Sequence, residues 1–276
     1  MKRRILIIAV AVLALGGAIY WLAHRNEQDT DDATIEAHAI PMMAKVSGYV
    51  TTVNILENHP VKAGEVLIQI DPRDYQNARD HAAGALAAAE ANLTNANLNL
   101  KRMQGMNSMA RTGKDLDDAV ANAASAAANE TVAKSQLAQA EKDLADTQLV
   151  APADGIVAER GVEPGMYVQP TTMLFYIVTP ERWVIANFKE TQLTRMQPGQ
   201  MVNIKIDAYP GLTLHGTVDS IQRGTGARFS LFPPQNASGN FVKIVQRVPV
   251  KILLDNPPEN VVLAPGMSVE PTVHTK

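Results

Sequence analysis

The chain has 276 residues, no cysteine and a formal charge of −3 at pH 7. The absence of cysteine excludes a disulfide framework, a thiolate metal site, a cysteine nucleophile and lipid attachment through cysteine. The near balance of 25 basic and 28 acidic side chains gives no sign of a nucleic-acid-binding surface, which would carry a strong basic excess. Only 5% of the residues are aromatic, and much of the 46% hydrophobic share is alanine. This composition favours an elongated molecule over a catalytic globule.

An apolar run near the N-terminus predicts a membrane anchor. Three basic residues (2–4) precede residues 5–23, which carry no charge. As a helix this run would measure roughly 29 Å, close to the hydrocarbon thickness of a bilayer. Tyr20 and Trp21 suit the interface at its far end, and the basic residues would keep the N-terminus in the cytoplasm. A cleaved signal peptide is the alternative, although its apolar region is usually shorter. No second run of this length occurs, so the chain is not expected to be a transporter itself.

Two segments resemble each other at a constant offset of 107 positions, residues 44–70 and residues 151–177. Gly48 and Gly155 are equivalent, and we interpret both as turn positions where a side chain would be in the way. The apolar positions alternate as in half-buried strands, and each copy is too small to fold alone. The two copies are therefore predicted to pack face to face in one small β-sandwich. The equivalent apolar pairs are Ala44/Ala151, Val50/Val157, Ile55/Val162, Val61/Val168, Leu67/Leu174 and Ile70/Ile177.

The residues between the two repeats predict two long helices. Apolar side chains recur at alternating spacings of four and three, which is a heptad seam, and Glu130 is the one interruption. Residues 106–112 are predicted to reverse the chain, so the helices, about 33 residues or roughly 50 Å each, would form an antiparallel coiled-coil hairpin. A helical domain packed on the sandwich is the alternative, but the seams are narrow for it. The predicted seam positions are 82, 86, 89, 93, 96, 100 and 103, then 116, 119, 123, 126, 130, 133, 137, 140 and 144.

The C-terminal part predicts a small, closed or nearly closed β-barrel. Residues 181–254 contain alternating segments separated by Pro-Gly turns, and residues 34–40 could add a strand from the N-terminal side. Pro249 is expected at an edge strand or a bulge, because proline cannot donate to a sheet ladder. The alternating side chains are Trp183, Ile185 and Asn187, then Val202, Ile204 and Ile206, then Val248, Val250, Ile252 and Leu254.

The motifs of common enzymes and metal sites are missing from the sequence. The six histidines are scattered without metal-binding spacing, and there is no nucleophile elbow, phosphate loop or dinucleotide fingerprint. Asp71 and Asp74 flank a proline at a strand-to-helix junction, where a role in starting the helix outweighs acid–base work. The sequence therefore predicts a protein with no catalytic residue, no metal and no cofactor.

A lipoyl-like motif split by a helical hairpin, behind one N-terminal anchor, resembles the membrane fusion proteins, the periplasmic adaptor subunits of tripartite exporters in Gram-negative bacteria. Residues 224–243 (GTGARFSLFPPQNASGNFVK), the VQRVPV that follows, and residues 30–34 (TDDAT) resemble the EmrA-type branch of the HlyD family. The resemblance covers nearly the whole chain. It implies a single-pass inner-membrane protein with most of its chain in the periplasm. Its implied partners are an inner-membrane transporter, a TolC-like outer-membrane channel and further copies of itself in a ring, a trimer or a hexamer.

The number of residues after the last predicted barrel strand helps to distinguish between classes of partner transporter. Only 22 residues follow Leu254, too few for the extra membrane-proximal β-domain of resistance-nodulation-division adaptors. The resemblance therefore favours a major facilitator partner and export of drugs or other hydrophobic toxicants. An adaptor of an ABC-type (type I) secretion system is the alternative, although those adaptors generally have longer hairpins. A biotin or lipoyl carrier is a further alternative, but residues 71–74, where the modified lysine would sit, contain none.

The resemblance also implies contact residues at two places. Many family members carry an Arg-Leu-Ser pattern at the hairpin tip that meets the outer-membrane channel; Arg102, Met106 and Thr112 are the matching positions, and the last two are substitutions. In the long barrel loop, which the family places toward the inner membrane, three phenylalanines either close the barrel wall or contact the transporter or a neighbouring adaptor. These are Phe229, Phe232 and Phe241.

The predicted fold is thus an elongated α+β chain: an N-terminal transmembrane helix, a lipoyl-like β-sandwich split by an antiparallel coiled-coil hairpin, and a C-terminal β-barrel. The expected parts are a cytoplasmic N-terminus (1–4), a transmembrane anchor (5–23), a linker with the first barrel strand (24–43), the first lipoyl-like half (44–72), the α-helical hairpin (73–148), the second half (149–180), and the β-barrel domain with the C-terminal tail (181–276).

Overall fold

The computed structural model describes residues 26–107, 112–225, 245–258 and 261–275. These divide into two compact units. The first contains residues up to 38 and residues from 180 onward, and the second contains residues 39–179. The predicted anchor, residues 5–23, lies outside the described residues. Within the described part of the chain, no helix combines the length and the apolar character needed to cross a membrane.

The second unit contains a sandwich of two small sheets. One sheet has the strand order β6-β5-β3-β8, and the other is formed by β4, β7 and the first part of β9. Neighbouring strands within each sheet pair antiparallel. The strands are β3 (Gly48–Val53), β4 (Pro60–Val61), β5 (Val66–Ile70), β6 (Gln148–Val150), β7 (Gly155–Ala158), β8 (Tyr167–Val168) and β9 (Met173–Lys189).

Both repeats contribute to a single hydrophobic core in this sandwich, which confirms the prediction from the repeat. Every equivalent apolar pair of the two copies is buried in the same cluster, from Ala44/Ala151 to Ile70/Ile177. Burial of a large aliphatic side chain contributes about 1.5–3 kcal/mol. Either half alone would leave its apolar side chains exposed to water and lose this contribution, so the core requires both halves. Phe175, which the repeat did not single out, is fully buried beside them.

The two equivalent glycines begin strands instead of forming turns, which corrects one part of the prediction. Gly48 is the first residue of β3, and Gly155 is the first residue of β7. A Cβ at Gly48 would lie 2.6 Å from Cγ2 of Ile70, and a Cβ at Gly155 would lie 2.5 Å from Cγ2 of Ile177. Each glycine is therefore packed against the isoleucine that ends its own repeat.

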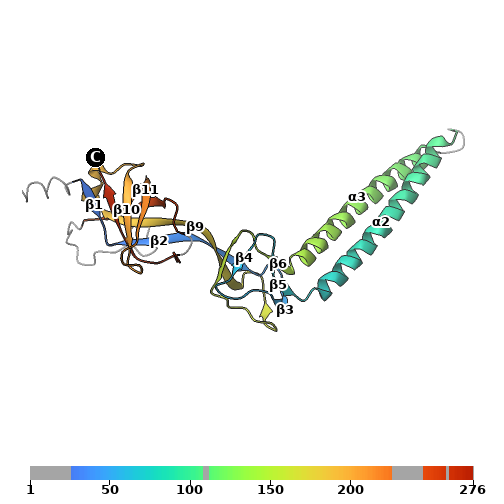
Figure 1. The fold of residues 1–276 in the computed structure, drawn as a ribbon. Helices are drawn as coiled ribbons and strands as arrows, with labels where there is room; N and C mark the ends of the chain where they lie inside the picture. The colour runs from blue at the N-terminus through green and yellow to red at the C-terminus, as the bar shows by residue number, and fades with distance from the viewer. Residues whose placement is uncertain (1–25, 108–111, 226–244, 259–260, 276) are drawn as a thin grey trace, which may run out of the picture. The chain divides into compact units, whose positions relative to one another are not determined.

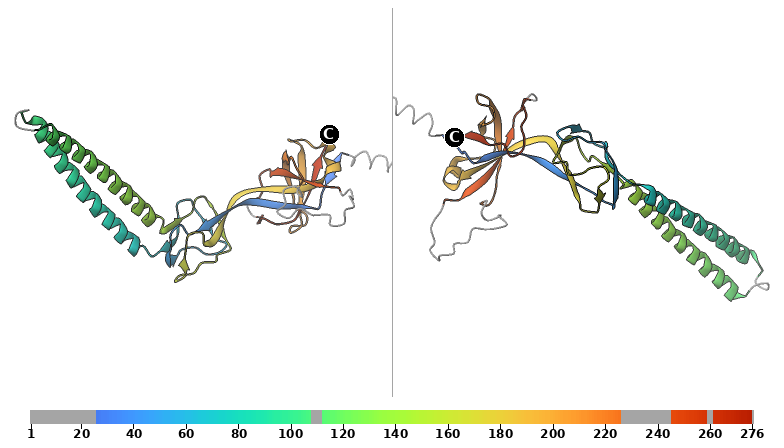
Figure 2. Two further views of the ribbon diagram at one scale, coloured as in Figure 1. Left: turned by 180° about the vertical axis from the view of Figure 1, so that it is seen from behind. Right: turned by 90° about the horizontal axis from the view of Figure 1, so that it is seen from below.

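Two helices of 33 residues form the predicted hairpin, α2 (Arg73–Gly105) and α3 (Gly113–Ala145). They run side by side in every view and connect to the sandwich after β5 and before β6 (Figures 1 and 2). Every predicted seam position is half-buried or buried. Ala119, Ala123 and Ala133 of α3 are the buried ones, while α2 has no buried residue. The helices are therefore packed on each other along a narrow seam, as the heptad spacing predicts.

The first unit is the predicted β-barrel, which is closed by an isolated bridge between β2 and the residue before β13. Its strands follow the order β1-β13-β10-β11-β12-β9, and β2 pairs with β9. Thr34 of β2 bridges to Ser268, and the backbone N–H of Ile35 donates to the carbonyl of Met267 at 2.9 Å. The strands not yet named are β1 (Glu27–Asp29), β2 (Ala33–Met43), β10 (Met201–Ile206), β11 (Thr213–Ile221), β12 (Arg247–Leu254) and β13 (Val269–His274), with a 3-10 helix η1 (Glu190–Arg195) after β9.

In β10, and in β12 as far as Ile252, the buried side chains are the ones that the sequence alternation predicts. In β9 they are not. Val184, Ala186 and Phe188 of β9 are fully buried, whereas the expected set that starts at Trp183 is half-buried. Pro249 lies in a strand paired on both sides, with Asn187 of β9 opposite it, so the expectation of an edge position is wrong. The neighbouring β11 does carry an irregularity between Val218 and Ser220.

Candidate interaction surfaces

The tip of the hairpin holds the three residues proposed to contact a channel. Arg102 lies exposed in the last turn of α2, where its guanidinium donates to the side-chain carbonyl of Asn99 at 3.4 Å. Met106 follows the helix directly and is 38% exposed. Thr112 is the N-cap of α3. The structure therefore brings an exposed cation, an exposed apolar side chain and a hydroxyl to the same end of the hairpin, and residues 108–111 between them lie outside the described part.

The Thr112 hydroxyl is engaged in starting α3. It accepts the backbone N–H of Asp115 at 3.2 Å and donates to Oδ2 of Asp115 at 2.7 Å. The same carboxylate accepts the backbone N–H of Thr112 at 2.9 Å, which completes a capping box. These bonds from Thr112 favour the ionised carboxylate and hold the pKa of Asp115 below its ordinary value. Thr112 thus has a structural role that the resemblance alone did not reveal.

Polar contacts fix the base of the hairpin to the sandwich. The phenol of Tyr75 donates to the carbonyl of Ser47 at 2.7 Å, and burial raises the pKa of this phenol. The ammonium of Lys45 lies 3.1 Å from Oδ1 of Asp146, whose side chain is mostly buried. These contacts link both helices to the loop before β3, so the first turn of α2 and the end of α3 are held by the sandwich.

The junction between β5 and α2 is built by an aspartate and an arginine. Nε and Nη2 of Arg73 donate to the Asp71 carboxylate at 3.0 and 2.6 Å, and the backbone N–H of Arg73 donates to it at 3.1 Å. The side-chain bonds from Arg73 are the main reason that the pKa of Asp71 is lowered. Asp71 therefore helps to begin the helix, as the sequence analysis favoured over acid–base work.

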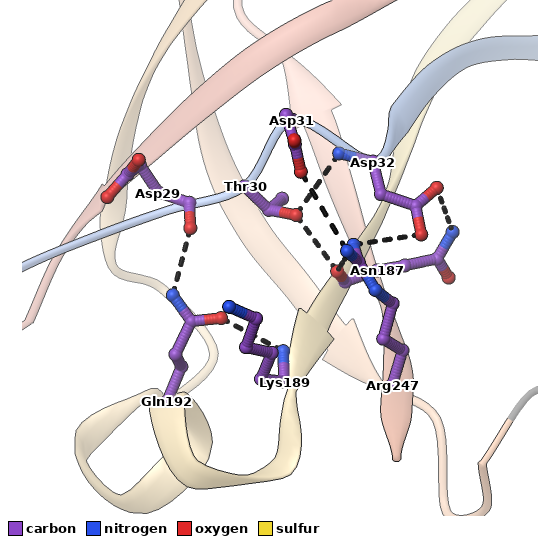
Figure 3. A network of polar contacts seen from close by, with 8 residues as sticks. All are labelled: Asp29, Thr30, Asp31, Asp32, Asn187, Lys189, Gln192 and Arg247. Atoms are coloured by element: carbon purple, nitrogen blue, oxygen red, sulfur yellow. Dashed lines mark hydrogen bonds and ion pairs between the residues drawn. The ribbon is translucent and has the colours of Figure 1, made fainter. Parts of the chain in front are cut away.

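In the barrel unit, a polar network surrounds the Thr-Asp-Asp segment before β2 (Figure 3). The hydroxyl of buried Thr30 donates to the carbonyl of Asn187 at 2.9 Å and accepts the backbone N–H of Asp32 at 3.2 Å. The side-chain amide of Asn187 donates to Oδ1 of Asp32 at 3.1 Å. The start of β2 is thereby tied to the second half of β9.

Arg247 joins this network from the first position of β12 (Figure 3). Its Nη1 lies 2.9 Å from Oδ2 of Asp32 and donates to the carbonyl of Asn187 at 3.3 Å, while Nη2 lies 3.9 Å from Asp31. In the sequence, the Thr-Asp-Asp segment served as a mark of resemblance, and the residues around Arg247 served as a further mark and as a predicted barrel strand. Nothing in the local sequence indicated that residues more than 200 positions apart would meet.

The phenylalanines proposed to contact a transporter or a neighbouring adaptor lie outside the described residues. Phe229, Phe232 and Phe241 all fall within residues 226–244. In the described residues, no group of three His, Asp or Glu side chains could hold a metal ion. Two open pockets of about 390 and 520 Å³ lie at the base and in the middle of the hairpin.

Comparison with known families covers nearly the whole chain. A family model described as the barrel-sandwich hybrid domain of RND membrane fusion proteins matches residues 39–180. A second model, described as the AAEA-like β-barrel domain, matches residues 182–275. The first of these alone spans about half of the 276 residues.

Individual relatives extend over the same length. The colistin resistance protein EmrA of Acinetobacter baumannii is 33% identical, with 96% of this chain and 92% of that protein covered. The multidrug export protein EmrA of Escherichia coli K12 is also 33% identical, with 95% of this chain and 80% of that protein covered. Among solved structures, the membrane fusion protein Spr0693 from Streptococcus pneumoniae R6 has the same fold, with a TM-score of 0.67 at 18% identity over 91% of this chain and 99% of that one.

The sandwich with its inserted hairpin lies within the residues that the first family model matches, and most of the barrel lies within those that the second matches. The chain belongs to the membrane fusion proteins and is similar to their EmrA members.

Proposed function

We propose that this protein is the periplasmic adaptor of a multidrug-type efflux system. It would be anchored in the inner membrane by residues 5–23 and would link a major facilitator transporter to a TolC-like outer-membrane channel. The observation that carries the proposal is the lipoyl-like sandwich interrupted between β5 and β6 by a hairpin of two 33-residue helices. The transporter would supply the energy, and the adaptor would contribute position and contact surfaces.

The names of the relatives support an efflux role. Three of them, each at least 33% identical over 95% or more of this chain, are named for colistin resistance, multidrug export and probable multidrug resistance. The cargo proposed for this chain is accordingly a set of drugs or other hydrophobic toxicants. An ABC transporter with a polypeptide cargo is the competing assignment that the experiments must separate.

Two contact surfaces follow from this role. The hairpin tip, with Arg102, Met106 and Thr112, would meet the channel, because a cation and an apolar side chain are exposed there. The loop with Phe229, Phe232 and Phe241 would face the transporter or a neighbouring copy. A single hairpin encloses no conduit, so several copies would have to surround one, and cyclic assembly is the usual way for identical subunits to do this.

The proposal is tested by deleting the gene and exposing cells to a panel of hydrophobic toxicants. We expect increased sensitivity to several compounds and restoration by the full chain. Arg102→Asp combined with Met106→Asp should fail to restore resistance while the protein stays folded and membrane-bound, because a contact site for the channel would be lost. Gln136→Asp, an exposed position on α3 away from the tip, is the matched control and should restore resistance.

Two results would count against the proposal at different points. Unchanged sensitivity to every compound would contradict the efflux role. Full resistance with the Arg102 and Met106 double variant would leave that role intact and remove the tip residues from the channel contact.

A further inference from the structure

The chain enters the barrel without slack at its first described residue, Asn26. The carbonyl of Asn26 accepts the backbone N–H and the hydroxyl of Thr275, each at 2.7 Å. Its side-chain oxygen accepts an N–H from the Arg195 guanidinium at 3.3 Å. Strand β1 begins at the next residue, Glu27, and pairs with β13. The barrel itself therefore fixes the position of Asn26.

This leaves little chain between the barrel and the proposed anchor. Residues 5–23 would end three residues before Asn26, and three fully extended residues span at most about 11 Å. The headgroup layer on each side of a bilayer is about 5–8 Å thick, because the hydrocarbon core accounts for about 30 Å of a total of about 40–45 Å. The barrel surface around Asn26 would therefore lie among the headgroups or no more than about 6 Å above them.

Two further elements reach the same end of the barrel. The 3-10 helix η1 is joined to β1, since the side-chain amide of Gln192 donates to the carbonyl of Asp29 at 2.9 Å (Figure 3). Strand β10 begins at Met201, beside the end of β13, because the following residue, Val202, pairs with Val273. The end of η1 and the start of β10 therefore lie near the point where the chain enters the barrel.

The surface at this point, residues 195–201, is called the entry surface and presents one cation and one exposed apolar side chain. Arg195 is exposed, and within the residues that the structure describes it forms no ion pair. Met201 is 70% exposed, because the alternation of the strand turns it away from buried Val202. The residues between Arg195 and Met201 (MQPGQ) carry no charge.

Acidic groups on the neighbouring elements limit any general attraction to anionic lipid. Strand β1 carries Glu27 and Asp29, and η1 begins with Glu190. The carboxylate of Glu27 lies 3.6 Å from Nδ1 of His274, whereas Asp29 and Glu190 are exposed. Contact with a membrane would thus depend on the short connection to the anchor and on Arg195, and not on the charge of the whole barrel end.

We propose that the entry surface rests on the phospholipid headgroups of the membrane that holds the anchor. Arg195 binds a lipid phosphate, which its planar guanidinium can meet with two parallel N–H bonds. Met201 lies at the boundary between headgroups and acyl chains, where an apolar side chain is favoured. This inference deepens the proposed function, on whose anchor it rests, by naming the barrel surface that faces the lipid and the chemical group that it binds.

A protein partner is the competing occupant of the entry surface. Protein interfaces are built around buried cores that are enriched in aromatic and other large apolar side chains. Met201 is the one large apolar side chain that is exposed between residues 190 and 206, all of which the structure describes. A lone cation and a lone apolar side chain, within reach of the bilayer, fit lipid better than they fit a transporter.

Fluorescence quenching in vesicles tests the contact, because the chain has no cysteine and a single label can be placed at a chosen position. Gln197→Cys, at an exposed position of the entry surface, is labelled with nitrobenzoxadiazole. The full chain is then reconstituted in vesicles of phosphatidylethanolamine and phosphatidylglycerol, in which some of the lipid carries a nitroxide on its headgroup. The matched control is Val262→Cys, which is also exposed but precedes β13, whereas the entry surface lies beside the end of that strand.

The label at position 197 should be quenched, and the label at position 262 should not. Because the headgroup layer is only about 5–8 Å thick, the nitroxide should dim the first label roughly twofold or more and leave the second nearly unchanged. Arg195→Glu, added to the Gln197→Cys chain, should lower this quenching roughly twofold, since attraction to phosphate is replaced by repulsion. Arg195→Lys should retain the quenching because the charge is kept, and this variant separates lost contact from lost folding.

The outcomes separate this inference from the proposed function. Vesicle flotation shows first whether the labelled chain is anchored, and a chain that leaves the vesicles would contradict the anchor and the inference together. An anchored chain with no quenching at position 197, with equal quenching at position 262, or with no effect of Arg195→Glu would overturn the lipid contact and leave the efflux role standing. The predicted quenching, in a protein whose deletion leaves drug sensitivity unchanged, would support the contact and contradict the efflux role.

Discussion

At the scale of single residues, the sandwich depends on two glycines that have no room for a methyl group. Gly48 and Gly155 are equivalent in the two repeats and are pressed against equivalent isoleucines, Ile70 and Ile177. The repeat predicts correctly that a side chain would be in the way at both positions. The expectation of turns is wrong, because a glycine in a sequence does not indicate whether it is required by the backbone conformation or by a closely packed neighbour.

Gly155→Ala is expected to destabilise the sandwich by about 1–3 kcal/mol, the usual effect of overpacking. The new methyl group would meet both Cγ2 of Ile177 at 2.5 Å and the backbone carbonyl of Val178 at 2.7 Å, and the backbone cannot easily move aside. Hydrogen exchange of the β7 and β9 amides measures the effect. Gly84→Ala, where an added Cβ meets nothing within 4 Å, is the control and should stabilise α2 by about 1 kcal/mol. Equal protection of the β7 and β9 amides in the Gly155→Ala and Gly84→Ala variants would contradict the close packing of Gly155 against Ile177.

Thr112→Ala is expected to loosen the start of α3 by removing its N-cap. Protection of the first-turn amides should fall roughly fivefold, and Thr112→Ser should retain it. The folded-state pKa of Asp115 is lowered, so the capping contribution is present above the ordinary carboxyl pKa and is lost as the pH falls through the lowered value. The difference between wild type and Thr112→Ala should therefore shrink in acid. A difference that does not change with pH would mean that the Asp115 carboxylate takes no part in the cap.

At the scale of elements, the hairpin could be predicted closely and the barrel less so. The hairpin depends on local periodicity, and the spacing of four and three identified every seam position correctly. The barrel depends on which strands pair, and this cannot be read from local periodicity. In β9 the buried side chains are therefore Val184, Ala186 and Phe188, one position away from the alternating set expected from the sequence. The same long-range pairing places Pro249 between two strands and adds β13 to the barrel, a strand that was not predicted from the sequence.

The candidate site was predicted only in part, for the same reason. Arg102, Met106 and Thr112 could be located at the tip because the helix ends follow from the seam. The capping box could be read from neighbouring residues once the helix start was known. The contact of Arg247 with Asp32 could not be predicted, because it joins positions far apart in sequence through the barrel closure.

Ala119→Leu tests the close approach of the two helices. Ala119 is 3% exposed in the seam, so a larger side chain should force the helices apart and destabilise the hairpin by about 1–3 kcal/mol. Thermal unfolding followed by helical circular dichroism measures the change. Ala124→Leu, one residue after a seam position and exposed, is the matched control and should leave hairpin stability nearly unchanged. Similar melting of the two variants would contradict a narrow alanine seam.

At the scale of the whole molecule, the chain consists of two units with separate hydrophobic cores. One core holds together the two repeats from which the hairpin emerges, and the other closes the barrel. Both units match domain models that place the chain among the membrane fusion proteins. In the proposed function, this chain would contribute position and contact surfaces, and a partner transporter would supply the energy for export.

The most direct measurement is affinity purification of the tagged full chain from detergent-solubilised membranes, with identification of the membrane proteins that accompany it. We expect a major facilitator transporter together with a TolC-like channel. Recovery of an ABC ATPase would assign the protein to type I secretion instead, and recovery of no transporter at all would contradict its role as an efflux adaptor.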